Sequence, residues 1–423
     1  MRLGHKQARA DRTVVYFALY ACTMSVLNIP AAQNALHEAD ISSALDKLVA
    51  QLAATAVLRD QQGGHAAAER QAIRASGLLN LGTPREWGGL GLPWSTVYRV
   101  VRKLAQVDSA LAHVFAFHHL QIASIRLFGT AEQAERLLKE TVAGNLFWGN
   151  ALNPLDKRSL ATETPTGFVL HGDKSYCSGS VGSDRMVASG WHEASQSLVI
   201  AALPTSRAGV TVVADWDAFG QRQTDSGTVR FEQVKVGHDE VLTYPGTVVT
   251  PLRTLRTQVA QLVLTNLYLG IAQGAFEEAR TQIRHHTRPS MFSTAATASQ
   301  DPYIQHRFAE LWLLLRPALL LADDAAQQLD RALLQGQSLS AEQRGEVAIA
   351  VNEAKVLAHR AAMEVSSQFF ELTGARATSQ KLGLDRFWRN ARVHTLHDPV
   401  DYKYRDIGRY LLDGQYPEPT SYS

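Results

Sequence analysis

Three polar side chains near the C-terminal end of the chain have the types and the spacing that proton chemistry needs. Asn390, His394 and His397 stand four and then three residues apart. Because positions i, i+4 and i+7 lie on one face of a helix, the amide and the two imidazoles should point the same way. Imidazole gains or loses its proton near neutral pH. The pattern predicts a site for proton management; the alternative is a pair of hydrogen-bonded structural histidines at a corner between two helices.

The next two residues, Asp398 and Pro399, predict where this helix ends. The residue before a proline is biased away from helical conformation, and aspartate followed by proline is typical of the N-cap and first position of a new helix. Asp398 is therefore predicted to cap a second helix with its side-chain oxygen. Both histidines then fall in the last turn of the first helix, whose dipole favours a protonated ring.

The composition is that of an ordinary soluble globular protein with two or three domains. The chain has 423 residues, of which 45% are hydrophobic and 19% charged. A net charge of +2 and the absence of a basic run give no electrostatic case for a nucleic-acid partner. The two cysteines, Cys22 and Cys177, are too few for a disulfide framework or a zinc knuckle. A reducing, cytoplasmic location is therefore expected.

The N-terminus imitates a signal peptide. Basic residues from Arg2 to Arg12 precede an apolar stretch from Val14 to Leu27, which is short and too polar to span a bilayer comfortably. We favour the interpretation that translation begins at Met24 and that residues 1–35 form a poorly ordered extension.

The remainder divides into three sections and a tail. Helical periodicity covers residues 36–143 and returns in residues 246–412, while residues 413–423 form an irregular tail. Residues 144–245 contain short alternating runs without β/α alternation, which predicts a small antiparallel sheet or barrel. Within it, residues 166–177 alternate around a His-Gly-Asp sequence and are expected to form a hairpin that turns there.

This order of helical, β and helical sections resembles the acyl-CoA dehydrogenase fold, and two local motifs agree. Pro84-Arg-Glu-Trp-Gly-Gly-Leu-Gly91 is similar to the glycine-rich turn near the N-terminus of that superfamily. Gly167-Phe-Val-Leu-His-Gly-Asp-Lys174, followed by Ser178-Gly179, is similar to its central β-hairpin. The resemblance covers the chain from about Ala44 onward. It implies an α+β multi-domain protein with an N-terminal helical domain, a central antiparallel β-barrel or sheet and a C-terminal helical bundle.

Two departures distinguish the chain from the dehydrogenases, which need a carboxylate base and a flavin. Many of them have a Glu-Gly pair where His397-Asp-Pro399 stands, and Asp398 is shorter and committed to its predicted cap. Their acidic Thr-Glu-Pro…Gly-Ser-Asp loop is replaced by Asn145-Leu-Phe-Trp-Gly-Asn-Ala-Leu-Asn153.

Several long segments instead resemble the flavin-dependent two-component monooxygenases of the superfamily, most closely the dibenzothiophene monooxygenases. These segments are Pro204-Thr-Ser-Arg-Ala-Gly-Val-Thr211, Gln223-Thr-Asp-Ser-Gly227, Phe387-Trp-Arg-Asn-Ala-Arg392, His394-Thr-Leu-His-Asp-Pro399 and Asp413-Gly-Gln-Tyr-Pro417.

The resemblance implies a reaction with a second protein component. Reduced FMN arrives from a separate NAD(P)H-dependent flavin reductase and captures O₂ as a C4a-hydroperoxide, whose outer oxygen passes to a soft nucleophile such as a thioether or thiophene sulfur. A site of this kind excludes water and supplies hydrogen bonds. The resemblance also implies a homotetramer that binds a small apolar sulfur-containing substrate, without nucleic acid or membrane as a partner.

Position by position, the resemblance implies roles for individual residues. Four are expected to act in the reaction: His113, Ser178, His394 and His397. Five are expected to bind the flavin: Asn150, Ser178, Trp216, Arg288 and Arg376, with Arg288 reaching the phosphate from a neighbouring subunit. Ordinary structural roles are the alternative, namely a core histidine or tryptophan, a turn asparagine or a helix-end arginine.

Residue 117 departs from the pattern, because Phe117 stands where the dibenzothiophene monooxygenases have a tyrosine near the reacting oxygen. The missing hydroxyl removes a hydrogen bond worth about 1 kcal/mol where it is made. Phe117 is expected to border the substrate, and its identity puts an aromatic sulfur substrate in doubt.

Three other functions stay open. An acyl-CoA dehydrogenase would use Asp398 or another carboxylate as its base. His394, His397 and Asp398 would form a metal site of the two-histidine, one-carboxylate kind, although the predicted cap points the carboxylate elsewhere, so no metal is expected. A non-catalytic protein that only binds flavin or builds an oligomer is the third.

Overall fold

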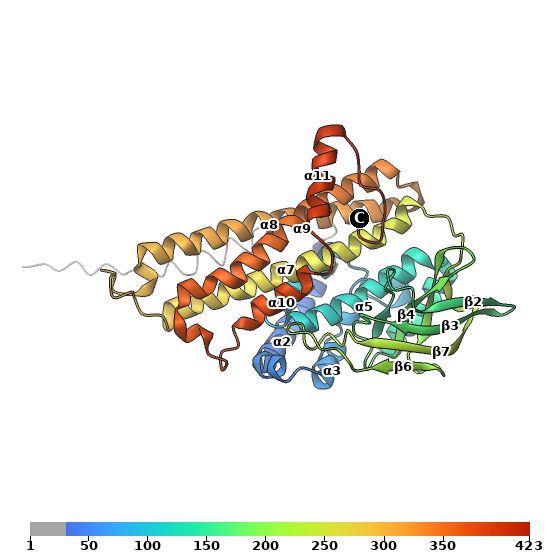
Figure 1. Cartoon of the computed structure of the whole chain (residues 1–423), viewed down its shortest axis with the longest axis horizontal. Coiled ribbons are helices and arrows are strands. Elements are labelled where there is room, and N and C mark those ends of the chain that lie inside the picture. The colour runs from blue at the N-terminus through green and yellow to red at the C-terminus, as the bar shows by residue number, and fades with distance from the viewer. Residues whose placement is uncertain (1–30) are drawn as a thin grey trace, which may run out of the picture. The chain divides into compact units, whose positions relative to one another are not determined.

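A computed structural model describes residues 31–423, with side chains from Asp40 onward (Figure 1). Residues 1–30, including the signal-like apolar stretch, lie outside the described residues. Residues 45–423 form one compact unit. Helix α2 (Ala31–Gln62) begins before Leu45 and continues into this unit. Residues 31–35, expected in the N-terminal extension, are therefore helical.

Within the part of the chain that the structure describes, two helical segments are long and apolar enough to cross a membrane by length and composition, Asp40–Gln62 and α7 (Pro251–His285). The α7 segment is mostly buried inside the protein, as a core helix is. Near the end of α2, Arg59 is also buried and pairs with Asp108 at 2.5 Å. Length and composition are accordingly weak evidence for a membrane span in either segment.

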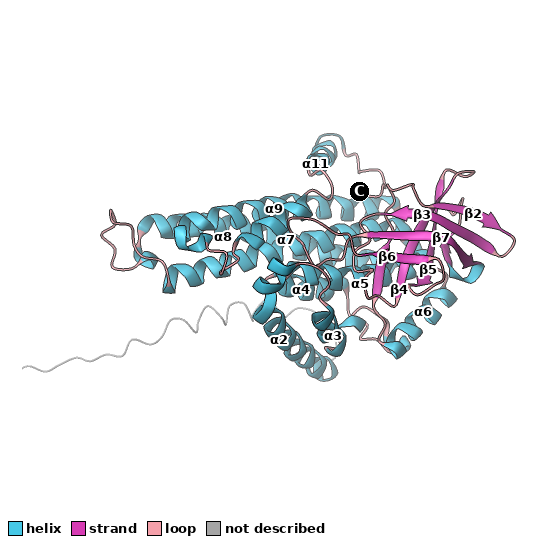
Figure 2. Ribbon diagram, turned by 60° about the horizontal axis from the view of Figure 1, so that its bottom comes forward, coloured by secondary structure: helices cyan, strands magenta, loops and turns pink. Residues whose placement is uncertain are grey.

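The helices that precede the sheet are α3 (Ala67–Ala75), α4 (Trp94–Ala105), α5 (Ser109–Phe128) and α6 (Ala131–Gly144). Helix α5 begins where the carboxylate of Asp108 accepts a hydrogen bond from the Leu111 amide at 3.0 Å. It is apolar on nearly all sides and is buried along most of its length. It packs on β1, α4 and α7, and Figures 1 and 2 show it between the sheet and the C-terminal helices.

The glycine-rich turn before α4 depends on a close approach of backbone to backbone. A Cβ atom on Gly89 would lie 2.1 Å from the carbonyl oxygen of Thr83, and Gly88 has a φ of +88°. Only glycine fits both conditions.

The strands are β1 (Trp148–Ala151), β2 (Leu160–Thr164), β3 (Gly167–Lys174), β4 (Arg185–His192), β5 (Ser197–Pro204), β6 (Val210–Val213), β7 (Thr228–Gly237) and β8 (Val241–Thr243). They form one sheet in the order β6-β7-β3-β2-β4-β5-β8, and β1 pairs with β4 outside this path. Both β1 and β2 pair with β4 in parallel. The sheet is therefore mixed rather than wholly antiparallel as expected, because the β2–β3 hairpin returns the chain so that β4 runs beside β1 in the same direction.

The expected hairpin turn at His171-Gly-Asp173 is wrong. Strand β3 continues through this sequence, and its register with β7 shifts between Leu170 and Gly172, which marks a β-bulge. Gly172 has a φ of +114°, and a Cβ atom there would lie 2.1 Å from the carbonyl oxygen of Arg158. The reversal occurs instead between Thr164 and Gly167, where β2 meets β3.

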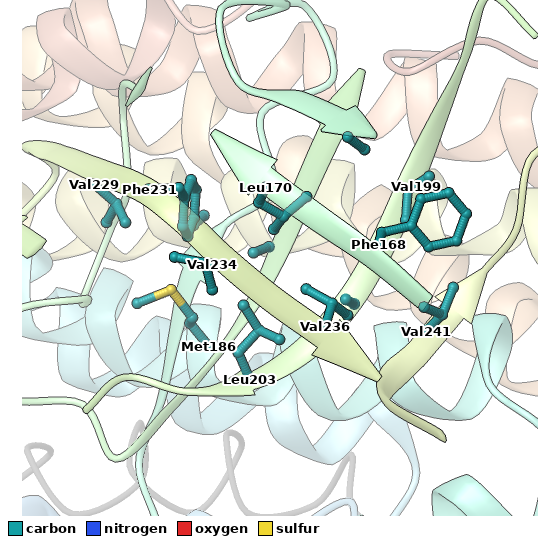
Figure 3. Close-up of a cluster of buried hydrophobic side chains, with 14 of the residues drawn as sticks. Phe168, Leu170, Met186, Val199, Leu203, Val229, Phe231, Val234, Val236 and Val241 are labelled. Carbon is teal, nitrogen blue, oxygen red and sulfur yellow. The ribbon is translucent and has the colours of Figure 1, made fainter. Parts of the chain in front are cut away.

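The sheet has apolar cores on both faces. On one face, side chains of β3 and β7 pack onto those of β4 and β5 (Figure 3), in a cluster that includes Phe168, Met186, Leu203, Phe231 and Val236. On the other, Trp148, Val187 and Ile200 pack with residues of α5 and α6 such as Ile125 and Leu138. Strand β1 is buried at every position, so its ends are held close to α5.

The C-terminal section consists of α7, α8 (Pro302–Gln335), α9 (Ala341–Thr373), α10 (Asp385–Thr395) and α11 (Asp401–Asp413). Helices α7, α8 and α9 are long and pack side by side (Figures 1 and 2). Helix α10 packs on α7 and α9. The short corner between α10 and α11 carries His397 and Asp398.

Candidate active site

Helices α5 and α10 bring two histidines together in the core. The rings of His113 and His394 have their centres 4.9 Å apart, with the ring planes at 48°. Phe117, one turn further along α5, stacks on His113 at 3.9 Å between ring centres. The Tyr268 hydroxyl on α7 donates a hydrogen bond of 2.9 Å to the backbone carbonyl of His394. Three residues singled out from the sequence, His113, Phe117 and His394, thus form one cluster.

The two imidazoles lack protein partners. Neither ring nitrogen of His113 has a hydrogen-bond partner among the described residues, nor has Nε2 of His394. Both residues are 5% exposed. A buried polar atom left unpaired costs about 1–3 kcal/mol, and such atoms are uncommon in folded proteins. The pair is therefore a place where a bound molecule would supply the missing hydrogen bonds.

Both rings are neutral at pH 7. Burial lowers the pKa of His113 well below its usual value, and the nearby His394 and His397 lower it further. Burial, with smaller effects of His397 and Lys355, lowers the pKa of His394 to about 3. The protonated ring expected from the helix dipole is thus wrong for His394. A helix terminus stabilises an exposed cation by only about 0.3–1 kcal/mol, and desolvation of a fully buried ring outweighs it.

His397 lies beyond the helix rather than on its last turn. Helix α10 ends at Thr395, and the side chain of His397 is 40% exposed. Its ring meets the ring of Tyr422 edge to face at 5.5 Å between centres. Its Nδ1 lies 3.4 Å from Oδ1 of Asp398. The expected common face of three residues is therefore wrong, because the helix stops before position i+7.

Asn390 lies on α10 one turn before His394, and it binds backbone. Its Oδ1 accepts a hydrogen bond of 2.6 Å from the amide of Gln221, which belongs to the loop between β6 and β7. A small hollow beside it is lined in part by Ser109, Gln223 and Asn390. Ser109 is one turn before His113 on α5, and Asn390 is one turn before His394 on α10.

Asp398 does not cap the second helix. The residue before α11 is Val400, which makes no side-chain capping bond. The Asp398 carboxylate is buried and accepts a hydrogen bond from Nζ of Lys355, on α9. Nζ of Lys403, on α11, lies 3.7 Å from the other carboxylate oxygen, Oδ2. The capping prediction is wrong because two buried ammonium groups offer this carboxylate charge-assisted partners that backbone amides cannot match.

The Asp398 carboxylate stays ionised. Burial alone raises its pKa, but the hydrogen bond from His397 and the charge of Lys355 outweigh burial and hold the pKa well below its usual value. Within residues 31–423, no group of three or more His, Cys, Asp or Glu side chains is arranged to hold a metal ion. The residues of the metal alternative also diverge, since Asp398 is paired with lysines.

Ser178 and Asn150 meet on the sheet side of the cluster. The amide of Asn150, on β1, donates to the carbonyl of Ser178 at 3.0 Å. The Ser178 hydroxyl lies 2.8 Å from the hydroxyl of Ser226, which donates to Thr224 at 2.8 Å. All of these side chains are nearly buried.

Gln121, which was not predicted from the sequence, links the Ser178–Asn150 group to α5 through hydrogen bonds. Its Nε2 donates to Oδ1 of Asn150 at 3.2 Å and to the carbonyl of Phe117 at 3.3 Å. The turn after Ser178 also approaches α5, because a Cβ atom on Gly179 would lie 3.4 Å from Val114. Position 121 is i+4 from Phe117, a spacing that would have signalled the residue.

Trp216 belongs to the loop between β6 and β7. Its Nε1 donates to the carbonyl of Gln221 at 2.9 Å, and its ring is 6.1 Å from that of Tyr176, between centres. The same loop carries Ser226 and holds α10 through Asn390. It therefore connects the Ser178 group with α10.

Arg288 and Arg376 lie at the other end of the bundle. Both are exposed, and Thr287 donates to the carbonyl of Thr373 at 3.4 Å, so the two segments are neighbours. His285, where α7 ends, is 17 positions after Tyr268, which corresponds to roughly 25 Å at about 1.5 Å per residue. The structure does not bring these arginines to the imidazole pair of their own chain.

Two family profiles match the chain. Residues 34–145 match "Acyl-CoA dehydrogenase, N-terminal domain", and residues 262–402 match "Acyl-CoA dehydrogenase, C-terminal domain". Together they cover more than half of the chain and confirm the expected superfamily and fold.

Individual relatives specify the branch. The chain is 46% identical over 378 residues to the probable FMNH₂-dependent monooxygenase SfnC of Pseudomonas putida, covering 89% of this chain and 96% of the relative. It is 43% identical over 381 residues to dibenzothiophene monooxygenase of Rhodococcus qingshengii, covering 86% and 91%. The structure of methanesulfinate monooxygenase MsuC from Pseudomonas fluorescens superposes with a TM-score of 0.88 at 46% identity, covering 90% of this chain and 99% of that one.

Proposed function

The chain belongs to the flavin-dependent monooxygenase branch of the acyl-CoA dehydrogenase family, and from this we propose that it oxygenates a small organosulfur compound with reduced FMN supplied by a separate NAD(P)H-dependent reductase. It is an oxidoreductase that uses FMN. We further propose that it works as a cytoplasmic homotetramer.

One observation favours oxygenation over dehydrogenation: the Asp398 carboxylate is paired with a lysine, whereas ring nitrogens of His113 and His394 have no hydrogen-bond partner among the described residues. Asp398 is paired with Lys355, and its pKa lies below the usual range. A general base that removes a proton from carbon works best with a pKa near the working pH. His113 and His394 instead are buried and keep nitrogens without a hydrogen-bond partner among the described residues. Such groups suit hydrogen bonding to a reactive oxygen species.

The residues present fit a flavin. Ring nitrogens on α5 and α10 have no hydrogen-bond partner among the described residues, and Gln121 links the same stretch of α5 to Asn150 beside Ser178. We assign Ser178, Asn150 and Trp216 to the flavin ring. Arg288 and Arg376 are assigned to the phosphate of FMN bound to a neighbouring subunit, since both lie far from the imidazoles of their own chain.

The chemistry requires two electrons from outside the protein. Reduced FMN supplies them, so that one atom of O₂ goes to the substrate sulfur and the other leaves as water. The surroundings of His113 and His394 exclude water, which protects a reactive oxygen species from wasteful breakdown. Their neutral rings donate or accept hydrogen bonds at Nε2. His397, whose side chain is 40% exposed, lies between this site and the surface.

Phe117 is the side chain that we expect to contact the substrate. Phe117 stacks on His113 and presents no hydroxyl. The sulfur compound is therefore held by shape and apolar contact at this position, as a dibenzothiophene-type sulfide or thiophene or a smaller alkyl sulfur compound would be.

A substrate panel tests the proposal. The purified protein, a flavin reductase, FMN and NADH would be incubated under ¹⁸O₂ with dibenzothiophene, a dialkyl sulfide, a dialkyl sulfone and methanesulfinate. Mass spectrometry should detect one ¹⁸O atom added to at least one compound. Anaerobic bleaching of bound oxidised flavin by an acyl-CoA, without any oxygenated product in the panel, would instead establish the dehydrogenase.

A further inference from the structure

Lys355 is a buried cation that the proposed reaction leaves unused. It lies on α9 and is 1% exposed. Its Nζ donates to Oδ1 of Asp398 and to Oε1 of Gln261, on α7. Burial lowers the pKa of Lys355 to about 8 despite the opposing charge of Asp398, so the amine is mostly protonated at pH 7. A charge is costly in this position, which raises the question of what it does.

Asp398 connects this lysine to His397. The same Oδ1 that accepts from Lys355 lies 3.4 Å from Nδ1 of His397. An ionised carboxylate only accepts hydrogen bonds, and a neutral imidazole carries one N–H. The proton of His397 therefore belongs on Nδ1, and Nε2 is left as an acceptor. The same second-sphere logic orients histidines at other functional sites.

We propose that Lys355 is a positioning residue for proton transfer at His397. By holding Asp398 charged and in place, it keeps one proton on Nδ1 and leaves Nε2 to take a proton from a bound reactant and return it. In that transfer the proton's bond to its donor atom breaks as the bond to Nε2 forms, while Nδ1–H remains with Asp398. The inference rests on the proposed function, because that function supplies the reactant.

The lysine is needed because Asp398 alone would bind the imidazolium too strongly. A buried carboxylate next to an imidazole stabilises the protonated ring. A cation on the far side of the carboxylate weakens this attraction.

Other titratable or charged groups surround the His397–Asp398 pair from every neighbouring element. They are His113 on α5, Tyr268 on α7, His359 on α9, Arg392 and His394 on α10, Asp401, Lys403 and Asp406 on α11, and Tyr422 in the tail. Lys355 differs from the other cations because it donates directly to the oxygen atom that also faces His397.

The test measures proton binding by His397 in the flavin-free protein. Modification of His397 by diethyl pyrocarbonate, which attacks the unprotonated ring, would be followed by peptide mass spectrometry from pH 5 to 9 (about four units around the usual histidine pKa). In Lys355→Met the midpoint should rise by about one pH unit or more. Lys355→Arg, which keeps the charge, should restore the wild-type midpoint.

Lys174 provides the matched control. It is also fully buried, but its Nζ donates to the backbone carbonyls of Asn153 and Asp156 in the β section. Lys174→Met should leave the His397 midpoint unchanged. A shift as large as that of Lys355→Met would mean that loss of any buried lysine disturbs the ring, and would overturn the proposal.

A second variant keeps the proposal testable where Lys355→Met fails to fold. Asp398→Asn removes the carboxylate and leaves Lys355 charged, so the His397 midpoint should fall. An unchanged midpoint in a folded Lys355→Met protein, or in Asp398→Asn, would overturn the linkage. Because no flavin or substrate is present, shifted midpoints together with a failed substrate panel would refute the proposed function alone.

The pH dependence of turnover tests whether Lys355 also affects the reaction itself. The acidic limb of kcat should move with the His397 midpoint in Lys355→Met and return in Lys355→Arg. A limb that stays in place while the midpoint moves would show that the lysine tunes His397 without serving the reaction, and the positioning role would be wrong.

Discussion

Two buried polar groups lie on either side of the end of α10, and burial has opposite consequences for them. His113 and His394 are buried, and among residues 31–423 neither nitrogen of His113 nor Nε2 of His394 has a hydrogen-bond partner; burial keeps both rings neutral. Asp398, Lys355 and Lys403 are equally buried, but each meets an opposite charge, so the cluster stays ionised. Burial alone therefore does not decide the charge of a group. The charged groups and hydrogen-bond partners beside it decide its charge. A buried polar atom without a protein partner can bind a ligand.

Removing an unpartnered imidazole should cause the largest change in activity. His394→Ala should lower substrate oxygenation by roughly 100-fold or more, while the fold and FMN binding persist, because no protein hydrogen bond to its Nε2 is lost. Product formed per reduced FMN consumed measures this. His306→Ala, on the exposed face of α8, is the control. Full oxygenation by His394→Ala would place the reaction elsewhere.

Removing a partner from the charged cluster should mainly cost stability. Asp398→Leu strands Lys355 and Lys403 without their carboxylate, and loss of one partner of a buried ion pair costs about 3–5 kcal/mol. Urea unfolding followed by circular dichroism measures the free energy of unfolding. Asp385→Leu breaks the exposed pair with Arg389 and should cost at most about 1 kcal/mol. Similar losses in the two variants would contradict the contrast between the regions.

Acid should separate the two regions as well. The unfolded chain protonates His394 near pH 6.5, but the folded ring does so only near pH 3. Between these values the unfolded state binds the extra proton, so stability falls as the pH falls. From pH 7.5 to 4.5 this residue should remove roughly 3 kcal/mol from the free energy of unfolding. His394→Leu should show a correspondingly flatter pH dependence; an identical slope in both proteins would refute the low pKa.

The smallest effect should follow from giving the imidazole pair a new neighbour. Phe117→Tyr adds a hydroxyl to the ring that stacks on His113. One extra hydrogen bond, worth about 1 kcal/mol, should change the ratio of product to reduced FMN consumed by about fivefold. Unchanged ratios across several sulfur compounds would show that residue 117 lies away from the oxygen-transfer step. Phe219→Tyr, on an exposed loop, is the matched control.

Some structural outcomes follow from short stretches of chain. The cap at Asp108, the glycine-rich turn at Gly89 and the end of α10 before Pro399 depend on neighbouring residues, whose conformational preferences can be read locally. The order of helical, β and helical sections follows in the same way from hydrophobic periodicity. The family's motifs are equally local, and they pointed to His113 and His394.

Other outcomes depended on residues distant in the chain. Glycine is required at the bulge because the carbonyl oxygen of Arg158 leaves no room for a Cβ atom at position 172. The parallel pairing of β1 with β4 needs the hairpin between them. Gln121 acquires its role only when β1 is laid against α5. Local spacing marks neither the bulge nor the strand pairing. The i, i+4 spacing of Phe117 and Gln121 marks the residue but not its partner Asn150, because the energy of these contacts comes from packing between elements.

Asp398 summarises the division. Its local sequence, Asp before Pro, predicts a helix break, and α10 ends three residues earlier, at Thr395. That sequence also predicts a helix cap, but folding places Lys355 and Lys403 beside the carboxylate. In a buried environment, a charged group pairs with the nearby group of opposite charge that attracts it most strongly. The sequence alone thus determined that two histidines and an aspartate lie near a corner between two helices. The packing of α5, α9 and α11 determined that His394 is neutral, with no partner for its Nε2 among the described residues, and that Asp398 is charged.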